Sequence, residues 1–236
     1  MSAGFDRRRR TLLPERMDTE AVDAADLATC LDDLERLTRV TAGYAPTLRW
    51  IARVTAKLPP GTVPTVLDVG CGGGDMLRRL WRWSRRRGRP LRLRGIDRNP
   101  LMVALARART PAEAPIEYAT GDALAPNAGE PPDFIVSALF LHHLDEAEAV
   151  GFLRWMHGHA RRGWLVNDLH RHALPYWFLR ALGPFPMHPF VRHDGPVSVA
   201  RGWTGAELRA LAQAAGVPAR LRWHMPFRWA LESEAP

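Results

Sequence analysis

The sequence lacks long apolar runs. Its best stretch, Phe134–Leu141, is eight residues long and contains Ser137, whereas a membrane-spanning helix needs about 20 apolar residues. Charged residues, and not the apolar segment of a secretory signal, follow the arginines at Arg7–Arg10. We therefore expect no membrane span and a cytoplasmic location.

Cysteine and lysine are also scarce. Cys30 and Cys71 are too few for a disulfide framework or a cysteine-based zinc site, which fits a reducing compartment. Lys57 is the only lysine, so arginine provides nearly all the positive charge behind the net charge of +8. The clusters Arg7–Arg10 and Arg85–Arg87 have two interpretations: contacts with nucleic-acid phosphates, or a solvated basic surface, which we favour.

What is present is typical of a folded protein. The 236 residues, 46% hydrophobic and 25% charged, fit one large domain. Residues 1–22 are charged and lack apolar periodicity, which predicts a mobile, arginine-rich arm. Residues 23–58 form a predicted helical cap, because apolar side chains recur at helical spacing over Ala24–Val40 and a second helix over Pro46–Lys57 precedes Pro59-Pro60-Gly61. Residues 59–236 then form the main domain.

Within the main domain, short apolar runs alternate with helical patterns. This alternation predicts an α/β fold, a Rossmann-like doubly wound sheet. An aromatic, proline-rich insertion at residues 172–195 interrupts it after the fifth strand. Thr204 and Glu207 predict a capping box at the start of a last helix. The predicted strands are Val63–Val69, Leu91–Ile96, Ile116–Ala119, Phe134–Leu139, Trp164–Val166 and closing strands within Arg220–Leu231.

The most informative segment is Thr65–Met76, where a buried strand enters a glycine-rich turn and then a helix. A dinucleotide fingerprint would need glycine where Asp75 stands, and the phosphate loop needs a lysine that is absent from this segment. Asp68 on the first strand and Asp97 at the end of the second would repel a diphosphate and hold a cationic ligand with ribose hydroxyls. S-adenosylmethionine has those features.

These motifs resemble those of the class I S-adenosylmethionine-dependent methyltransferases. The matching segments, in the family's order, are Val66–Met76, Gly95-Ile96-Asp97, Gly121-Asp122-Ala123 and Phe134–Leu144. The resemblance covers about residues 60 to 230 and implies a seven-stranded sheet whose last strand is antiparallel. It implies that Asp97 binds the ribose, Asp122 the adenine amine, and Asp68 the ammonium group or the loop itself. The implied cofactor-binding residues are Asp68, Gly70, Cys71, Gly72, Gly74, Asp97, Arg98, Asp122, Ala123 and Ala138.

Three segments are more similar to the small-molecule subgroup, which includes quinone and phenol methyltransferases. They are Phe140–Leu144, Asn167–Arg171 and Arg192–Ser198. Ser137–Phe140 stands where exocyclic-amine nucleic-acid methyltransferases usually carry an Asn/Asp-Pro-Pro-Tyr/Phe tetrapeptide. We therefore expect a small hydrophobic aromatic or quinone-like acceptor, with the 172–195 insertion acting either as a lid over it or as core or dimer interface.

Methyl transfer from S-adenosylmethionine mainly requires in-line alignment, so we expect no metal. A phenol acceptor would benefit from a base, for which histidine suits. We favour His143 and then His142, with His170 and His193 as further candidates. The histidine pairs 157/159 and 170/172 lack the carboxylate pattern of a metal site.

Other functions stay open at this stage. RNA or protein methylation would use the arginine-rich surface, and a non-catalytic partner subunit would retain the fold alone. The intact glycines, together with Asp97 and Asp122, favour an active enzyme, and it could form a homodimer.

Overall fold

The computed structural model describes residues 5–20, 22–122, 130–183 and 186–234. Their centre is a seven-stranded sheet of order β3-β2-β1-β4-β5-β7-β6. Neighbouring strands from β3 to β5 are parallel, while β7 is antiparallel to β5 and β6, which confirms the predicted architecture. The strands are β1 Thr65–Val69, β2 Arg92–Asp97, β3 Ile116–Thr120, β4 Phe134–Ala138, β5 Gly163–Leu169, β6 Arg220–His224 and β7 Arg228–Glu234.

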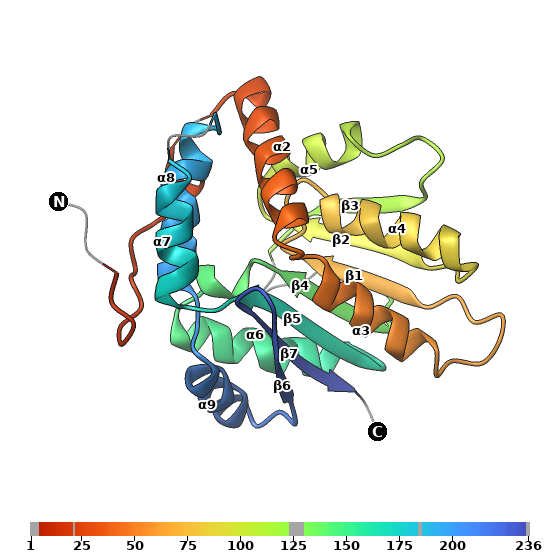
Figure 1. Cartoon of the computed structure of the whole chain (residues 1–236). Helices are drawn as coiled ribbons and strands as arrows, with labels where there is room; N and C mark the ends of the chain where they lie inside the picture. The colour runs from red at the N-terminus through yellow and green to blue at the C-terminus, as the bar shows by residue number, and fades with distance from the viewer. Residues whose placement is uncertain (1–4, 21, 123–129, 184–185, 235–236) are drawn as a thin grey trace.

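Helices cover both faces of the sheet (Figure 1). The helices α3 (Ala45–Thr55), α4 (Asp75–Arg87) and α5 (Pro100–Ala108) pack on one face, and α6 (Glu146–His159) and α9 (Gly205–Ala215) pack on the other. Because side chains alternate along a strand, Phe134 and Val136 of β4 enter the first core while Ile135 enters the second. The strand ends are thereby held in fixed relative positions.

The last helix, α9, begins as its sequence predicts. Thr204 accepts a hydrogen bond from the Glu207 backbone, and the Glu207 side chain accepts one from the Thr204 backbone in return. The helix ends at Gly216, whose φ of 67° is in the left-handed region.

Helices outside the sheet layers form a cap over the carboxyl ends of the strands. The cap contains α1 (Arg16–Thr19), α2 (Ala24–Val40), α7 (Ala173–Ala181) and α8 (Pro189–Arg201), with the short 3₁₀ turn η1 (Leu141–His143) beneath it. In Figure 1, α7 and α8 lie together to the left of α2 and of the sheet. The 172–195 insertion is therefore mostly helical; its residues 184–185 lie outside the described part.

The N-terminal segment differs from the mobile arm that we expected. Arg10 stacks on Trp203 with its guanidinium carbon 3.4 Å from the ring centre, and it donates hydrogen bonds to the carbonyl oxygens of His142, Leu144 and Arg201. Glu15 is only 3% exposed. Apolar periodicity could not reveal this packing because polar contacts with the cap hold the segment.

Candidate active site

The glycine-rich loop between β1 and α4 has the backbone geometry that glycine allows. Gly70, Gly72 and Gly74 have φ values of 70°, 49° and 74°, which side-chain-bearing residues rarely adopt. A Cβ atom on Gly70 would lie 2.6 Å from the Phe140 ring, whereas one on Gly72 would meet nothing within 4 Å. Gly72 therefore presents open main chain at which a ligand could lie.

Asp97 ends β2 beside this loop. Its two carboxylate oxygens accept hydrogen bonds from the backbone N–H groups of Gly72, at 2.8 Å, and Asn99, at 2.9 Å. The side chain is partly exposed, so its remaining lone pairs can accept bonds from ligand hydroxyls. The predicted proximity of Asp97 to the glycine loop is thus present.

A cavity of about 160 Å³ lies over the loop, under α2. Asp68 on its wall is 2% exposed, and its Oδ1 atom has no hydrogen-bond partner among the described residues. Burial, with the nearby carboxylates of Asp75 and Asp97, holds the pKa of Asp68 well above its usual value. A cationic ligand group at Oδ1 would satisfy this buried acceptor.

Arg228, at the start of β7, lines the same cavity. It is 5% exposed, and its Nη1 atom also has no partner within the part of the chain described. The cavity therefore offers one buried, unsatisfied carboxylate oxygen and one buried, unsatisfied guanidinium nitrogen. This pair matches the ammonium and carboxylate of a free amino acid, which fits the methionine part of S-adenosylmethionine.

The other residues implied by the resemblance divide into two groups. Cys71 and Ala138 line the cavity together with Gly70, Gly72 and Asp68. Gly74, at the start of α4, packs against Tyr118. Arg98, just after β2, and Asp122, just after β3, are exposed. Ala123 lies outside the described residues. Sequence reasoning missed Arg228, because a strand residue far along the chain carries no motif.

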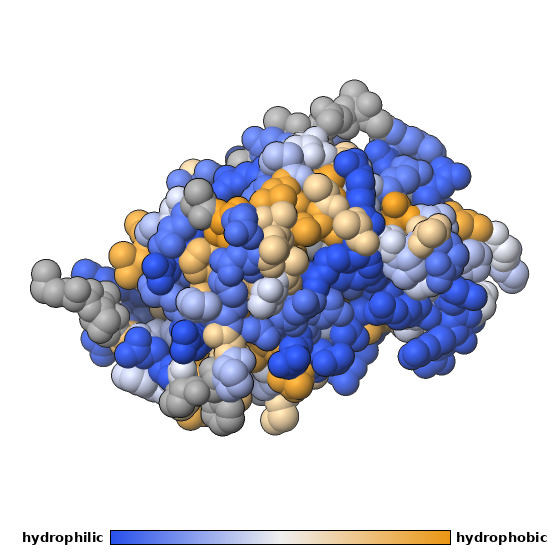
Figure 2. Space-filling view, turned by 90° about the horizontal axis from the view of Figure 1, so that it is seen from above, coloured by the Kyte–Doolittle hydropathy of each residue, from blue (hydrophilic) through white to orange (hydrophobic). Residues whose placement is uncertain are grey.

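A second, larger pocket of about 590 Å³ lies between α2 and α7, beside the cavity over the glycine-rich loop, which we call the cofactor cavity. Its wall is mainly apolar. Five residues line both spaces, so the two are adjacent: Met17, Leu34, Thr38, Leu139 and Arg228. Leu139 has a φ of 56°, an uncommon left-handed conformation that places it between the two spaces. Figure 2 shows apolar residues gathered near the middle of the upper face, with hydrophilic residues around them.

Both histidines favoured from the sequence line this larger pocket. His142 is buried; its Nδ1 lies 2.7 Å from Asp168 of β5 and its Nε2 lies 3.4 Å from Glu15. Burial lowers the pKa of His142, but the carboxylates of Asp168 and Glu15 outweigh it and raise the pKa to about 9. His142 is therefore held rigidly between two carboxylates.

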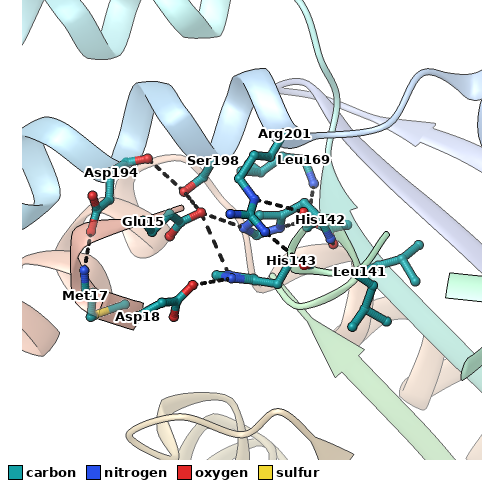
Figure 3. Close-up of polar contacts among 12 residues, drawn as sticks. Glu15, Met17, Asp18, Leu141, His142, His143, Leu169, Asp194, Ser198 and Arg201 are labelled. Carbon is teal, nitrogen blue, oxygen red and sulfur yellow. Dashed lines mark hydrogen bonds and ion pairs between the residues drawn. The ribbon is translucent and has the colours of Figure 1, made fainter. Parts of the chain in front are cut away.

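His143 is more accessible, with 21% of its side chain exposed. Its Nδ1 lies 2.9 Å from Asp18, and its Nε2 lies 3.9 Å from Glu15 (Figure 3). His170 and His193 are absent from the walls of both spaces, as far as the described residues define them. Glu15 and Asp18 come from the segment that the sequence analysis expected to be a mobile arm, so neither was predicted to lie here.

The other two segments of the small-molecule resemblance hold this region together. The Asn167 side chain donates a hydrogen bond to the carbonyl oxygen of Gly43, just before α3. The carboxylate of Asp168 is hydrogen-bonded to Nδ1 of His142. Asp194 of α8 accepts from the backbone N–H groups of Arg16 and Met17, and Ser198 lies 2.7 Å from Glu15. These residues therefore position the cap and the N-terminal segment around the pocket.

Comparison with known proteins agrees with this geometry. Residues 66–163 match a family model described as "Methyltransferase domain". This part of the chain is therefore similar to a methyltransferase domain. No curated protein sequence matches the chain. The matched residues run from β1 to the first residue of β5 and include the glycine-rich loop and Asp97.

Solved structures show the same fold at low sequence identity. Magnesium protoporphyrin IX methyltransferase from Synechocystis PCC 6803, crystallised with bound SAH, superposes with a TM-score of 0.59 at 16% identity, over 87% of this chain and 94% of that one. An O-methyltransferase family protein from Burkholderia thailandensis superposes with a TM-score of 0.60 at 18% identity, over 86% of this chain and 57% of that one. Human N-acetylserotonin methyltransferase in complex with SAM superposes with a TM-score of 0.54 at 15% identity, over 78% of this chain and 50% of that one.

Some arginines of the two clusters contribute to the fold itself. Arg10 is used within the fold, as described above, and Arg85–Arg87 form the last turn of α4, where positive charge stabilises the helix. In the described part of the chain, none of the helices is long and apolar enough to cross a membrane.

Proposed function

We propose that the chain transfers a methyl group from S-adenosylmethionine to an oxygen atom of a small hydrophobic aromatic or quinone-like molecule. The observation that carries this proposal is the adjacency of two spaces. One has a glycine-rich wall with two buried, unsatisfied charged groups suited to an amino-acid nucleoside, and the other is apolar and contains two histidines.

Residues of three strands would hold the cofactor in and beside the first space. Asp97 would bind the ribose hydroxyls, Asp68 the ammonium and Arg228 the carboxylate, while Gly72 leaves room for the chain between them. The bound cofactor supplies an electrophilic methyl group on a positively charged sulfur atom. Asp122 stays our candidate for the adenine amine.

The second space would hold the acceptor. Its volume lies within the range of about 300–1,000 Å³ that is typical of small-molecule pockets, and its apolar wall favours a flat hydrophobic ring. Leu174 and Phe178 of α7 line it, which supports the lid interpretation of the 172–195 insertion. An acceptor bound there would lie beside the first space across the shared wall at Leu139 and Arg228, so proximity and orientation would supply most of the rate enhancement.

His143 would accept the proton from the acceptor hydroxyl. Asp18 binds its Nδ1, which leaves Nε2 as the proton acceptor facing the pocket. His142 is less available, because its side chain is buried and its Nε2 lies nearer to Glu15, at 3.4 Å, than the Nε2 of His143 does, at 3.9 Å. A positioned base contributes about 10²- to 10⁴-fold to such a reaction.

A methyl-transfer screen against phenols and hydroquinones tests this function. We expect the wild-type enzyme to methylate members of this set, and His143→Ala to lower kcat about 100-fold or more while the affinity for S-adenosylhomocysteine is unchanged. His159→Ala, a change on the exposed face of α6, is the matched control. Undiminished turnover in His143→Ala would remove His143 as the base, and methylation of RNA but not of small phenols would contradict the acceptor class.

A further inference from the structure

Glu15, His142 and His143 bring three metal-ligating side chains together at the wall of the acceptor pocket. One carboxylate oxygen and two imidazole nitrogens lie within 4.8 Å of one another, the one such group of three found within the described ranges. Figure 3 shows the two rings side by side with Glu15 facing both. We propose that these residues bind a divalent first-row transition metal ion, contrary to our expectation from the sequence.

The orientation of the rings is the first argument. In metal sites, a ligating histidine commonly donates its other ring N–H to a carboxylate, which leaves the remaining nitrogen free to bind the ion. Here Asp168 lies 2.7 Å from Nδ1 of His142, and Asp18 lies 2.9 Å from Nδ1 of His143. Both Nε2 atoms therefore face the same oxygen of Glu15, and a bound ion would take the place of the proton that His142 carries there.

The separations are the second argument. Charge-assisted N–H···O bonds are about 2.7–2.9 Å long, but Glu15 Oε1 lies 3.4 Å from Nε2 of His142 and 3.9 Å from Nε2 of His143. Ligand atoms in a tetrahedral site with bond lengths of about 2.0–2.2 Å lie roughly 3.3–3.6 Å apart. Small side-chain rotations would thus bring the three atoms to an ion.

Charge is the third argument. Three carboxylates, Glu15, Asp18 and Asp168, surround the two rings. The guanidinium groups of Arg10 and Arg201 donate to the main-chain carbonyls of His142 and His143, and so leave the ring nitrogens to the cluster. The charges of Arg10 and Arg201 offset part of this negative charge, and a divalent cation would offset the rest.

The type of metal follows from the ligands. Two imidazoles and one carboxylate, with a further position open to a pocket, form the donor set of catalytic zinc and non-haem iron(II) sites. The pocket that His142, His143 and Glu15 line provides that open position. Zn²⁺ and Fe²⁺ are therefore favoured over Mg²⁺ or Ca²⁺, which prefer oxygen ligands.

Titration with Co²⁺ tests the site, because bound Co²⁺ gives visible absorption bands that report nitrogen and oxygen coordination. Full-length protein without a histidine tag, dialysed against EDTA, is expected to bind one Co²⁺ per chain. His143→Ala and Glu15→Gln should abolish this saturable signal. Asp18→Asn, which keeps all three ligands, should weaken binding about 10- to 100-fold.

The matched control is His172→Ala, in a second histidine pair whose rings lie 5.4 Å apart; it should bind Co²⁺ like the wild type. If Glu15→Gln fails to fold, as circular dichroism would show, His143→Ala and Asp18→Asn still decide the question. The proposal is overturned if the wild-type protein gives no one-to-one signal, or if His143→Ala leaves it unchanged. Either result would mean that the cluster is a hydrogen-bonded network without an ion.

One consequence rests on the proposed function. An ion on Nε2 of His143 would occupy the proposed proton acceptor, so saturating Zn²⁺ is expected to inhibit methyl transfer. Cobalt binding with uninhibited turnover would support the metal site and contradict His143 as the base. The absence of any methyl transfer would contradict the proposed function and leave the cobalt result to stand independently.

Discussion

At the scale of single residues, the buried charges decide what the cofactor cavity can bind. Asp68 Oδ1 and Arg228 Nη1 each lack a hydrogen-bond partner among the described residues, and burying such groups without partners costs free energy. A bound ligand, ion or water is a common reason for such a group in a native structure. The two groups therefore predict a zwitterionic ligand, and they distinguish the methionine end of the cofactor from its nucleoside end.

Changing Arg228 to glutamine should affect only the amino-acid end. A hydrogen bond to a charged group contributes about 1.5–3 kcal/mol, so we expect Arg228→Gln to weaken S-adenosylhomocysteine binding about 10- to 100-fold in calorimetry. Binding of 5′-methylthioadenosine, which lacks the amino-acid part, should stay the same. Arg220→Gln, an exposed arginine on β6, is the control. If the substitution weakened the binding of both ligands equally, Arg228 would not contact the amino-acid part of the cofactor.

The residues of the site differed in how well the sequence revealed them. Asp68, Asp97 and the loop glycines were predicted because they follow one another at strand ends within short motifs. His142 and His143 were predicted as candidates for the same reason. Arg228 and Glu15 were not, because they reach the site only through the antiparallel strand β7 and the N-terminal segment, whose contacts are tertiary.

At the scale of elements, the N-terminal segment is part of the site. It supplies Glu15 and Asp18, and Arg10 fixes it to η1, α8 and Trp203. A buried cation–π contact and hydrogen bonds from a charged donor are each worth about 1–3 kcal/mol. The segment should therefore contribute to stability as well as to the pocket.

We expect Arg10→Ala to lower the free energy of unfolding by about 2–4 kcal/mol. For a chain of this size, each kcal/mol corresponds to about 2–4 °C in Tm, so thermal denaturation should shift by roughly 5–15 °C. Arg9→Ala, its exposed neighbour, should leave Tm within about 1–2 °C of wild type. Identical Tm values for the two variants would show that the segment is loosely attached, as the sequence alone had indicated.

At the scale of the whole molecule, the sheet was predictable, whereas the packing of the cap helices against one another was not. The alternation of strands and helices from β1 to β5 follows from local periodicity, and two cores on opposite faces confirm it. The arrangement of α2, α7 and α8 depends on side chains that meet across the fold, such as Asp194 with Arg16 and Met17. The acceptor pocket between these helices could therefore not be derived from sequence patterns.

The cavity over the glycine loop, about 160 Å³, is smaller than the roughly 300 Å³ at which typical small-molecule pockets begin. Leu31 of α2 closes it, because an added Cβ on Gly73 would lie 2.9 Å from Leu31. We therefore expect binding of a whole cofactor to move α2 outward.

A crystal structure of the chain with S-adenosylhomocysteine tests the central claim most directly. The account predicts its ribose on Asp97, its ammonium on Asp68, its carboxylate on Arg228, and its sulfur at the Leu139 wall facing the pocket of His143. A ligand bound elsewhere, or one whose sulfur faces away from that pocket, would contradict it.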